Sequence, residues 1–280
     1  MKYLRLLRLP DQYIQFAAGI AAGMLLGSRE PRILWWAVAT IFLAIPAYMV
    51  NELVDRKDTD RYSWNPIHKK LQSDTYSIPI VGALFALSTA VGLLMSVLLG
   101  YEWFGLAMFV IGILYSLPPV RLKGRFGLDI AAQLSFLWIV PFLAPVWGRL
   151  STETILLFVI ISSLIISAAV FPYQLADFEA DRRAGLRNTH VTLGKRASIW
   201  LGILWGVVGM ALYSIYGMYA WAPWTVPAVL VVPVALWVYV RALTRHNAGE
   251  QARGMQRFVR FFQPLSRVFA AALLIAWFFQ

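Results

Sequence analysis

The sequence contains no cysteine, so the chain forms no disulfide, cysteine-ligated zinc site or iron–sulfur cluster and has no thiol nucleophile. Charged residues are also scarce. Asp, Glu, Lys and Arg make up 14% of the 280 residues, whereas they make up about a quarter of a soluble domain. Hydrophobic residues make up 60% of the chain, and the mean hydropathy is +0.65. This composition predicts a polytopic membrane protein.

The net charge of +11 comes from 25 Lys and Arg residues against 14 Asp and Glu residues. A nucleic-acid-binding protein gathers its basic residues on one soluble face, whereas the basic residues of this chain lie between apolar segments. We therefore expect a lipid bilayer around the chain and no nucleic-acid partner.

Nine segments are long and apolar enough to be transmembrane helices, which need about 20 residues, or fewer where a helix packs against its neighbours. We therefore predict an all-α integral membrane fold with nine transmembrane helices, in a single domain over residues 1–280. The predicted spans are 12–28, 33–50, 79–99, 102–117, 128–147, 153–171, 198–220, 224–243 and 264–279. The basic start of the chain resembles a signal peptide, but no small-residue cleavage site follows it, so we expect the first helix to be retained.

The distribution of Lys and Arg predicts the orientation of these helices. With a cytoplasmic N-terminus, 22 of the 25 basic residues face the cytoplasm, and only Arg29, Arg32 and Arg149 face the other side. No ionisable residue lies in the middle of a predicted span, which argues against a proton pump or an ion-coupled transporter. We expect the chemistry to take place at the cytoplasmic helix ends.

Half of the acidic residues lie in two short segments at those ends. The first Asp-rich segment, residues 51–60, follows the second span and contains Glu52, Asp55, Asp58 and Asp60. The second Asp-rich segment, residues 177–181, follows the sixth span and contains Asp177, Glu179 and Asp181. Scattered solubilising charge would not cluster in this way. We expect Asp55 and Asp177 to be interfacial and not to take part in packing.

On helices that continue from the two spans, the polar residues of each segment share one face. The aligned sets are Asn51, Asp55 and Asp58 in the first segment, and Tyr173, Asp177 and Asp181 in the second. Carboxylates one turn apart repel unless a cation lies between them, and Mg²⁺ is commonly held by one or two carboxylates together with water and substrate phosphate. One such segment alone is more often solvated charge, but two opposing segments could hold two Mg²⁺ ions around a diphosphate.

The loop after the fourth span combines two prolines with basic residues. It reads Tyr115-Ser116-Leu-Pro118-Pro119-Val-Arg121-Leu-Lys123-Gly-Arg125. The two prolines end the helix, and the alternating cations after them could reach back toward an anion. The same composition would also anchor an ordinary cytoplasmic loop to anionic lipid, so the loop alone leaves both interpretations open.

In order along the chain, these segments resemble the motifs of the UbiA superfamily of intramembrane prenyltransferases: NDxxDxxxD, a YSxPPxRLK-like loop and DxxxD. The stretch DFEADRRAGLRNTHVTLG, residues 177–194, is also similar to the family's DxExDxxxGxxTxxxxLG continuation. Two positions of the first motif differ, because Glu52 and Thr59 stand where the family has Asp. Helical geometry makes Asp58 the substitute for the last Asp, whereas an unwound helix would make it Asp60.

The resemblance implies Mg²⁺-dependent transfer of a prenyl group from a prenyl diphosphate to a hydrophobic or aromatic acceptor, as in quinone or lipid biosynthesis, in an active site that opens toward the cytoplasm. Stabilising the diphosphate leaving group with metal and fixed cations would supply most of the catalysis. The expected metal ligands are Asn51, Asp55, Asp58, Asp177 and Asp181. The expected catalytic residues are Asp55, Asp177, Asp181 and Tyr115, and the expected substrate-binding residues are Asn51, Ser116, Arg121, Lys123 and Tyr173. Tyr173 and Tyr48 could stabilise an allylic cation through their rings or anchor helix ends at the interface.

Other functions stay open. Residues 60–70 faintly resemble lycopene-elongating enzymes of the same fold, which prenylate an isoprenoid or carotenoid, and a terpene cyclase would use the same scaffold. A small-molecule transporter is a more distant alternative that predicts flux without diphosphate release. His68, His190 and His246 all fall in predicted loops, and we interpret them as surface histidines outside the catalytic set.

Overall fold

The computed structural model describes residues 2–9, 12–56 and 76–217, together with individual residues between 234 and 279. Within these residues the regular structure is helical, without strands. The first part contains α1 (Lys2–Leu7), α2 (Tyr13–Leu25), α3 (Pro31–Asp55), α5 (Ile78–Leu98) and α6 (Glu102–Ser116). The second part contains η3 (Leu122–Gly124), α7 (Leu128–Leu134), the π-helix η4 (Ser135–Ile139), α8 (Val140–Val146), α9 (Thr152–Arg183), α10 (Thr189–Leu193), α11 (Lys195–Leu212) and the π-helix η5 (Tyr213–Gly217).

Most of these helices correspond to the predicted spans. Four of them are long and apolar enough to cross a membrane: Pro31–Asp55, Ile78–Leu98, Leu128–Val146 and Lys195–Tyr216. The two halves of α9, bent by 47° relative to each other, pass the same test if they are taken as one span. Three shorter apolar helices cover Tyr13–Leu25, Glu102–Ser116 and Ala270–Phe279. The all-helical fold is therefore confirmed for the described residues. The eighth predicted span, 224–243, lies mostly outside them, so the number nine stays a prediction.

Local sequence signals account for several helix ends. Pro31 occupies the first turn of α3, where its fixed backbone angle suits a helix and its missing N–H costs nothing. The Ser151 hydroxyl accepts a hydrogen bond from the Thr154 amide at the start of α9. The Asn188 side chain accepts one from the Val191 amide at the start of α10. Both are ordinary N-cap interactions that satisfy amides left unbonded by the helix.

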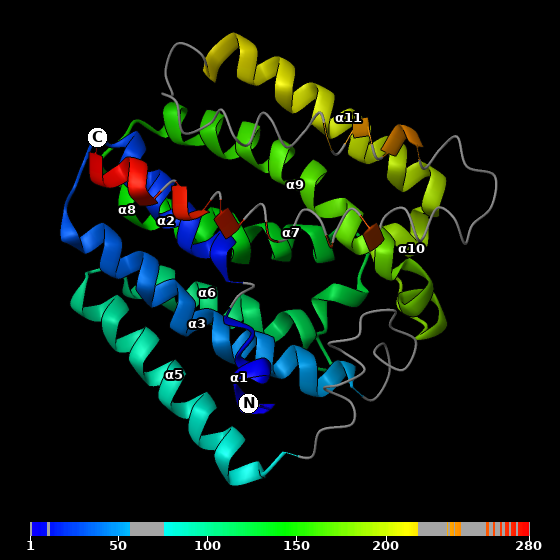
Figure 1. Ribbon diagram of the computed structural model, residues 1–280, viewed down its shortest axis with the longest axis horizontal. Coiled ribbons are helices and arrows are strands. Elements are labelled where there is room, and N and C mark those ends of the chain that lie inside the picture. Colours follow the sequence, from blue (N-terminus) through cyan, green and yellow to red (C-terminus); the bar gives the residue numbers. More distant parts are fainter. Residues whose placement is uncertain are drawn as a thin grey trace.

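The helices form a bundle in which α3 packs against α2, α5 and α6, while α9 packs against α11. In Figure 1, α5 and α11 lie at opposite edges of the bundle, with α3 and α9 between them. A stack of aromatic rings lies in the core, where the centroids of Phe142 and Phe158 are 3.9 Å apart and Trp138 stacks on both. The ends of α3, α6 and α9 carry the two Asp-rich segments and the start of the loop between them.

Small residues let α3 and α6 approach closely, as is common in membrane helix pairs. A Cβ placed on Gly112 of α6 would lie 2.7 Å from the Ala47 Cβ of α3 and 2.6 Å from the Phe136 ring. Both distances are shorter than van der Waals contact, and an Ala47 methyl group cannot rotate away. Position 112 therefore requires glycine if the two helices are to keep their spacing.

We expect Gly112→Ala to lower the thermal midpoint of the detergent-solubilised protein, because overpacking costs about 1–3 kcal/mol. Gly82→Ala is the matched control, since nothing lies within 4 Å of a Cβ at that position of α5. Its midpoint should stay equal to that of the wild type or rise slightly. Equal midpoints for the two variants would show that the contact between α3 and α6 is not tight.

Candidate active site

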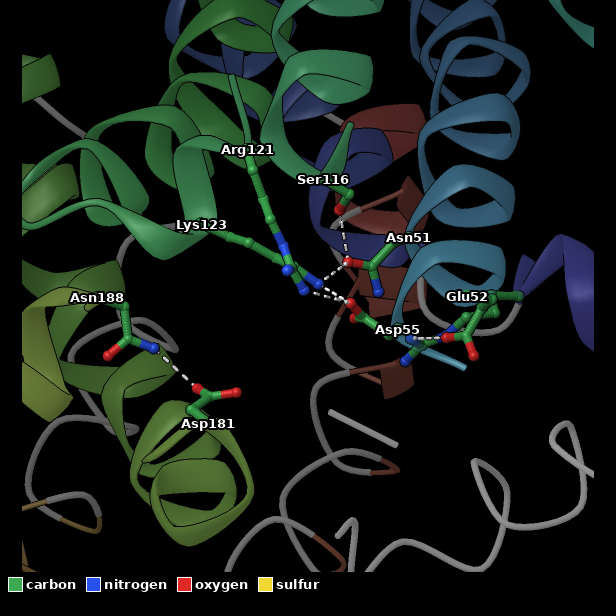
Figure 2. A network of polar contacts seen from close by, with 9 residues as sticks. Asn51, Glu52, Asp55, Ser116, Arg121, Lys123, Asp181 and Asn188 are labelled. Carbon is green, nitrogen blue, oxygen red and sulfur yellow. Dashed lines mark hydrogen bonds and ion pairs between the residues drawn. The ribbon is translucent and has the colours of Figure 1, made fainter. Parts of the chain in front are cut away.

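The ends of α3 and α6 meet the loop that contains η3, and polar side chains from all three converge (Figure 2). The Ser116 hydroxyl donates to Asn51 Oδ1 at 2.7 Å, and Lys123 Nζ donates to the same oxygen at 3.4 Å. Lys123 also forms an ion pair with Asp55 Oδ1, and Arg121 Nη2 lies 3.8 Å from that oxygen. These contacts form one network. It joins Asn51 and Asp55 of α3 to side chains that are 65 or more residues later in the sequence.

The backbone of the cation loop, residues 117–127, explains how both cations reach the same place. Arg121 has φ 40° and ψ 64°, in the left-handed region that residues other than glycine seldom adopt and that often marks functional sites. Its amide donates to the Leu117 carbonyl, and its own carbonyl accepts from the Gly124 amide. This tight turn directs the side chains of Arg121 and Lys123 toward Asn51 and Asp55 (Figure 2).

The cation loop is also attached to the segment that follows the second Asp-rich segment. The buried Asp129 carboxylate accepts hydrogen bonds from the backbone amide and the hydroxyl of Thr189. The Thr189 hydroxyl oxygen in turn accepts from the Gly127 amide at 2.8 Å, and Arg125 pairs with Arg187 through an isolated parallel β-bridge. The position of the cations is therefore coupled to the end of α9. Sequence reasoning missed Asp129 because it lies at the edge of an apolar span, outside either acidic cluster.

The second Asp-rich segment is part of α9, so Asp177 and Asp181 lie one turn apart on a continuous helix, as predicted. Asn188 donates to Asp181 Oδ2 at 2.8 Å while its own oxygen caps α10. Figure 2 shows Asp181 and Asn188 on the opposite side of the cations from Asn51 and Asp55. Asn188 was not among the predicted site residues, although it lies within the stretch 177–194 that matches the family pattern.

Lys123 interacts electrostatically with both Asp-rich segments. Its burial lowers the pKa of the ammonium to about 8, while the negative charges of Asp181, Glu52 and Asp177 act in the opposite direction. A single buried cation thus lies within electrostatic reach of carboxylates from α3 and α9. Such a group persists in a low-dielectric environment only when its charge is paired.

The other predicted site residues are placed as follows. Tyr115 lies at the end of α6, within electrostatic reach of Asp129, Asp177 and Asp181. Tyr173 packs partly buried against the core cluster around Phe171 and Leu175. Asp58, Asp60 and the lycopene-elongase-like stretch 60–70 lie outside the described residues.

The expectation that Asp55 is interfacial and takes no part in packing was wrong, and Glu52 on the same helix is buried as well. Asp55 is 9% exposed and Glu52 is 4% exposed. Glu52 forms an ion pair at 2.6 Å with Arg8, whose guanidinium also lies 5.3 Å from the centre of the Tyr48 ring. Helix α1 packs against α3 and brings Arg8 near the end of α3, a tertiary contact that has no sequence signature. Glu52 therefore connects the chain's N-terminal segment to the first Asp-rich segment.

The interpretation of His190 as a surface residue in a loop was also wrong. His190 lies on the short helix α10 and is 1% exposed. Its Nε2 pairs with Gln174 Oε1, and Gln174 Nε2 donates to Gln133 Oε1 at 2.6 Å. The ring also packs edge-on against Phe171, with centroids 4.7 Å apart. These four residues join α7, α9 and α10, so His190 is a packing residue beside the site.

Burial lowers the pKa of His190 from 6.5 to about 4. Because the imidazole takes up a proton more readily in the unfolded chain, its contribution to stability is complete above pH 6.5 and is lost as the pH falls toward 4, by up to about 1.4 kcal/mol per pH unit. We expect the thermal midpoint of the wild type to fall more steeply over this range than that of His190→Gln, which keeps a polar group but does not titrate. Identical pH profiles for the two proteins would contradict a buried neutral histidine.

The donor atoms of the site suit magnesium, because amide and carboxylate oxygens are the ligands that hard divalent cations prefer. Asn51 and Asp55 supply such atoms from α3, and Asp177 and Asp181 supply them from α9. Among the described residues, no three acidic or histidine side chains gather around one point. The buried ammonium bonded to Asp55 nevertheless shows that this position accommodates positive charge. The residues therefore fit Mg²⁺ in their donor chemistry.

An apolar helical bundle with two Asp-rich helix ends around a buried lysine and a partly buried arginine is the arrangement expected of an enzyme that handles a diphosphate at a membrane. The chain belongs to the UbiA prenyltransferase family, which matches residues 14–263, and is therefore a prenyltransferase.

Individual relatives agree with this assignment. A 4-hydroxybenzoate octaprenyltransferase of Coxiella burnetii is 26% identical over 224 residues, which cover 75% of this chain and 74% of that protein. A UbiA homologue from Archaeoglobus fulgidus, solved with GPP and Mg²⁺ bound, has a TM-score of 0.70 at 18% identity and covers 98% of this chain and 99% of its own. A UbiA homologue from Aeropyrum pernix, solved in its apo form, has a TM-score of 0.67 at 18% identity, with coverage of 95% and 97%. The last two similarities establish the fold.

Proposed function

We propose that this protein transfers a prenyl group from a prenyl diphosphate to an aromatic acceptor in a Mg²⁺-dependent reaction. The carbon–oxygen bond to the diphosphate breaks, the prenyl carbon bonds to the acceptor, and diphosphate and a proton are released. The observation that carries this proposal is the convergence of Arg121 and Lys123 on Asn51 and Asp55, with Asp181 on the other side (Figure 2). A fixed pair of cations between two acidic helix ends suits a highly charged leaving group held together with metal.

Each residue of the network has a distinct role in this proposal. Magnesium, held by Asn51, Asp55, Asp177 and Asp181, with Asp58 as a further candidate, would neutralise charge on the diphosphate. Arg121 and Lys123 bind the diphosphate oxygens directly, and the rigid turn of the cation loop limits the cost of ordering them. Ser116 orients the Asn51 amide through its hydrogen bond. Tyr115 lies at the cytoplasmic end of α6, where its ring would exclude water from the reacting carbon.

The acceptor class follows from the curated relative. The Coxiella protein acts on 4-hydroxybenzoate, and its similarity to this chain extends over three quarters of both proteins. This favours an aromatic acceptor of the kind used in quinone biosynthesis. A solved digeranylgeranylglyceryl phosphate synthase, with a TM-score of 0.62 at 15% identity, shows that a lipid-forming enzyme has the same fold, so a lipid acceptor is the second candidate.

The site requires a topology in which both Asp-rich segments lie on the same side of the membrane. We propose nine spans with the N-terminus inside, since this arrangement places 22 of the 25 basic residues on the cytoplasmic side. Because the chain has no native cysteine, single cysteines report orientation without background. In sealed, right-side-out vesicles a membrane-impermeant thiol reagent should label Glu153→Cys but not Arg183→Cys. The reverse pattern would show that the topology is inverted.

The activity is tested by diphosphate release from purified protein in nanodiscs, with dimethylallyl, geranyl and longer prenyl diphosphates and with 4-hydroxybenzoate or a membrane lipid extract as acceptor. We expect release to require Mg²⁺ and to fall at least a hundredfold in Asp177→Ala and in Asp55→Asn, because each removes an oxygen ligand or its charge. Mass spectrometry of the product distinguishes an aromatic from a lipid acceptor.

The matched control is Glu153→Gln, which removes a carboxylate charge at the other end of the same helix as Asp177. Its rate should equal that of the wild type. A rate near that of the wild type in Asp177→Ala or Asp55→Asn would refute the metal role of that segment. Mg²⁺-dependent diphosphate release without a prenylated acceptor would indicate a terpene cyclase, and flux of a solute without any release would indicate a transporter.

A further inference from the structure

Helix α9 contains a proline that interrupts its hydrogen bonds. Pro172 has no N–H, so it leaves the Ala168 carbonyl, four residues earlier, without its usual helical donor. The helix bends by 47° about one turn before the proline, between Thr152–Ala168 and Val170–Arg183. An unsatisfied carbonyl inside a membrane is strongly unfavourable, so it requires a donor from elsewhere.

The donor is Tyr239, from a different part of the chain. Its hydroxyl donates to the Ala168 carbonyl at 2.5 Å, and the side chain is fully buried. The ring lies against Gly202 of α11, where an added Cβ would lie 2.8 Å from Tyr239 Cζ. Tyr239 therefore lies between the bent helix and α11 and bonds to the carbonyl that Pro172 leaves without a helical donor.

At a second proline, a side chain from another helix again donates to the carbonyl that the proline leaves unbonded. Pro145 of α8 leaves the Pro141 carbonyl without its helical donor, and the indole N–H of the buried Trp36 donates to that carbonyl at 2.7 Å. This break lies about 25 Å along the span from Asp129, at 1.5 Å per residue, and thus at the far end from the candidate active site. Trp36 therefore provides an internal control for Tyr239.

The bend in α9 matters because the half of the helix beyond it carries Asp177 and Asp181. Asp181 lies twelve residues past the break at residue 169, or about 18 Å along the helix axis. At that distance the bend of 47° displaces Asp181 by about 14 Å from its position on a straight helix, and a change of only 10° would move it by about 3 Å. Metal ligands require placement to within about 0.5 Å.

We infer that Tyr239 is a positioning residue that sets the bend of α9, and with it the placement of Asp177 and Asp181 opposite the cation loop. Its hydroxyl supplies, in the bent form, the donor that Pro172 denies to the Ala168 carbonyl. The structural part of this inference stands alone, whereas its effect on catalysis rests on the proposed function.

The bend itself is measured by the distance between spin labels on Glu153→Cys and Arg183→Cys, two exposed positions near the ends of α9 in a chain without native cysteine. A straight helix would separate their backbones by about 45 Å, and the bend shortens this to about 41 Å. We expect Tyr239→Phe to lengthen or broaden this distance by up to about 4 Å. Trp36→Phe should leave it unchanged. An unchanged distance in Tyr239→Phe would overturn the inference whether or not the protein is a prenyltransferase.

Kinetics distinguish positioning from simple stabilisation. In Tyr239→Phe we expect the Mg²⁺ concentration for half-maximal diphosphate release to rise about fivefold or more, whereas Trp36→Phe should lower the thermal midpoint without changing that concentration. In the double variant Tyr239→Phe with Pro172→Ala, the restored amide bonds Ala168 and recovers the midpoint, but the straighter helix leaves the Mg²⁺ requirement high. If the double variant recovers both properties, Tyr239 serves only stability and the positioning role is refuted.

Discussion

The ion pair between Lys123 and Asp55 is the interaction around which the end of the bundle that carries the candidate active site is organised. Both groups are buried, and a buried charge is strongly unfavourable unless a partner compensates it. Asp55 comes from the end of α3 and Lys123 from the loop after α6, and Asp181 and Asp177 of α9 act on the same cation. The positions of these helix ends are therefore constrained by a common charge balance.

The need to pair these buried charges also explains why several contacts fix the position of the cation loop. Arg121 adopts an unusual left-handed conformation, and Asp129 and Thr189 tie the base of the loop to the segment after α9. A flexible loop would leave the two cations in solvent, where their attraction to Asp55 would be weak. Held in place, they form an electropositive site that need not reorganise when a highly charged ligand binds.

The rest of the bundle follows the constraint that a bilayer places on backbone polar groups. Each proline inside a crossing removes one helical hydrogen bond. At Pro172 and Pro145 the structure supplies a donor from another helix, a tyrosine in one case and a tryptophan in the other. Close contacts of glycine with Ala47, Phe136 and Tyr239 bring the helices near enough for these bonds to form. At these two prolines, close helix packing and the hydrogen bonding of the freed backbone carbonyls thus depend on each other.

The sequence by itself determined the class of fold and the chemical character of the site. Long apolar segments separated by basic loops can satisfy their backbone only as membrane helices, and periodicity alone aligns Asn51 with Asp55 and Asp177 with Asp181. The same local reasoning identified Arg121 and Lys123, which follow the prolines of the loop, as cations that could reach an anion. These features depend on neighbours in sequence, which is why they were predictable.

Only the tertiary structure decided which partners these residues have. It paired Lys123 with Asp55, Arg8 with Glu52, Asn188 with Asp181, and Tyr239 with the carbonyl freed by Pro172. It also placed His190 in the interior, although its local sequence resembles a polar loop. No periodicity in the chain encodes these contacts, because each joins segments whose relative position is set by packing of the whole bundle.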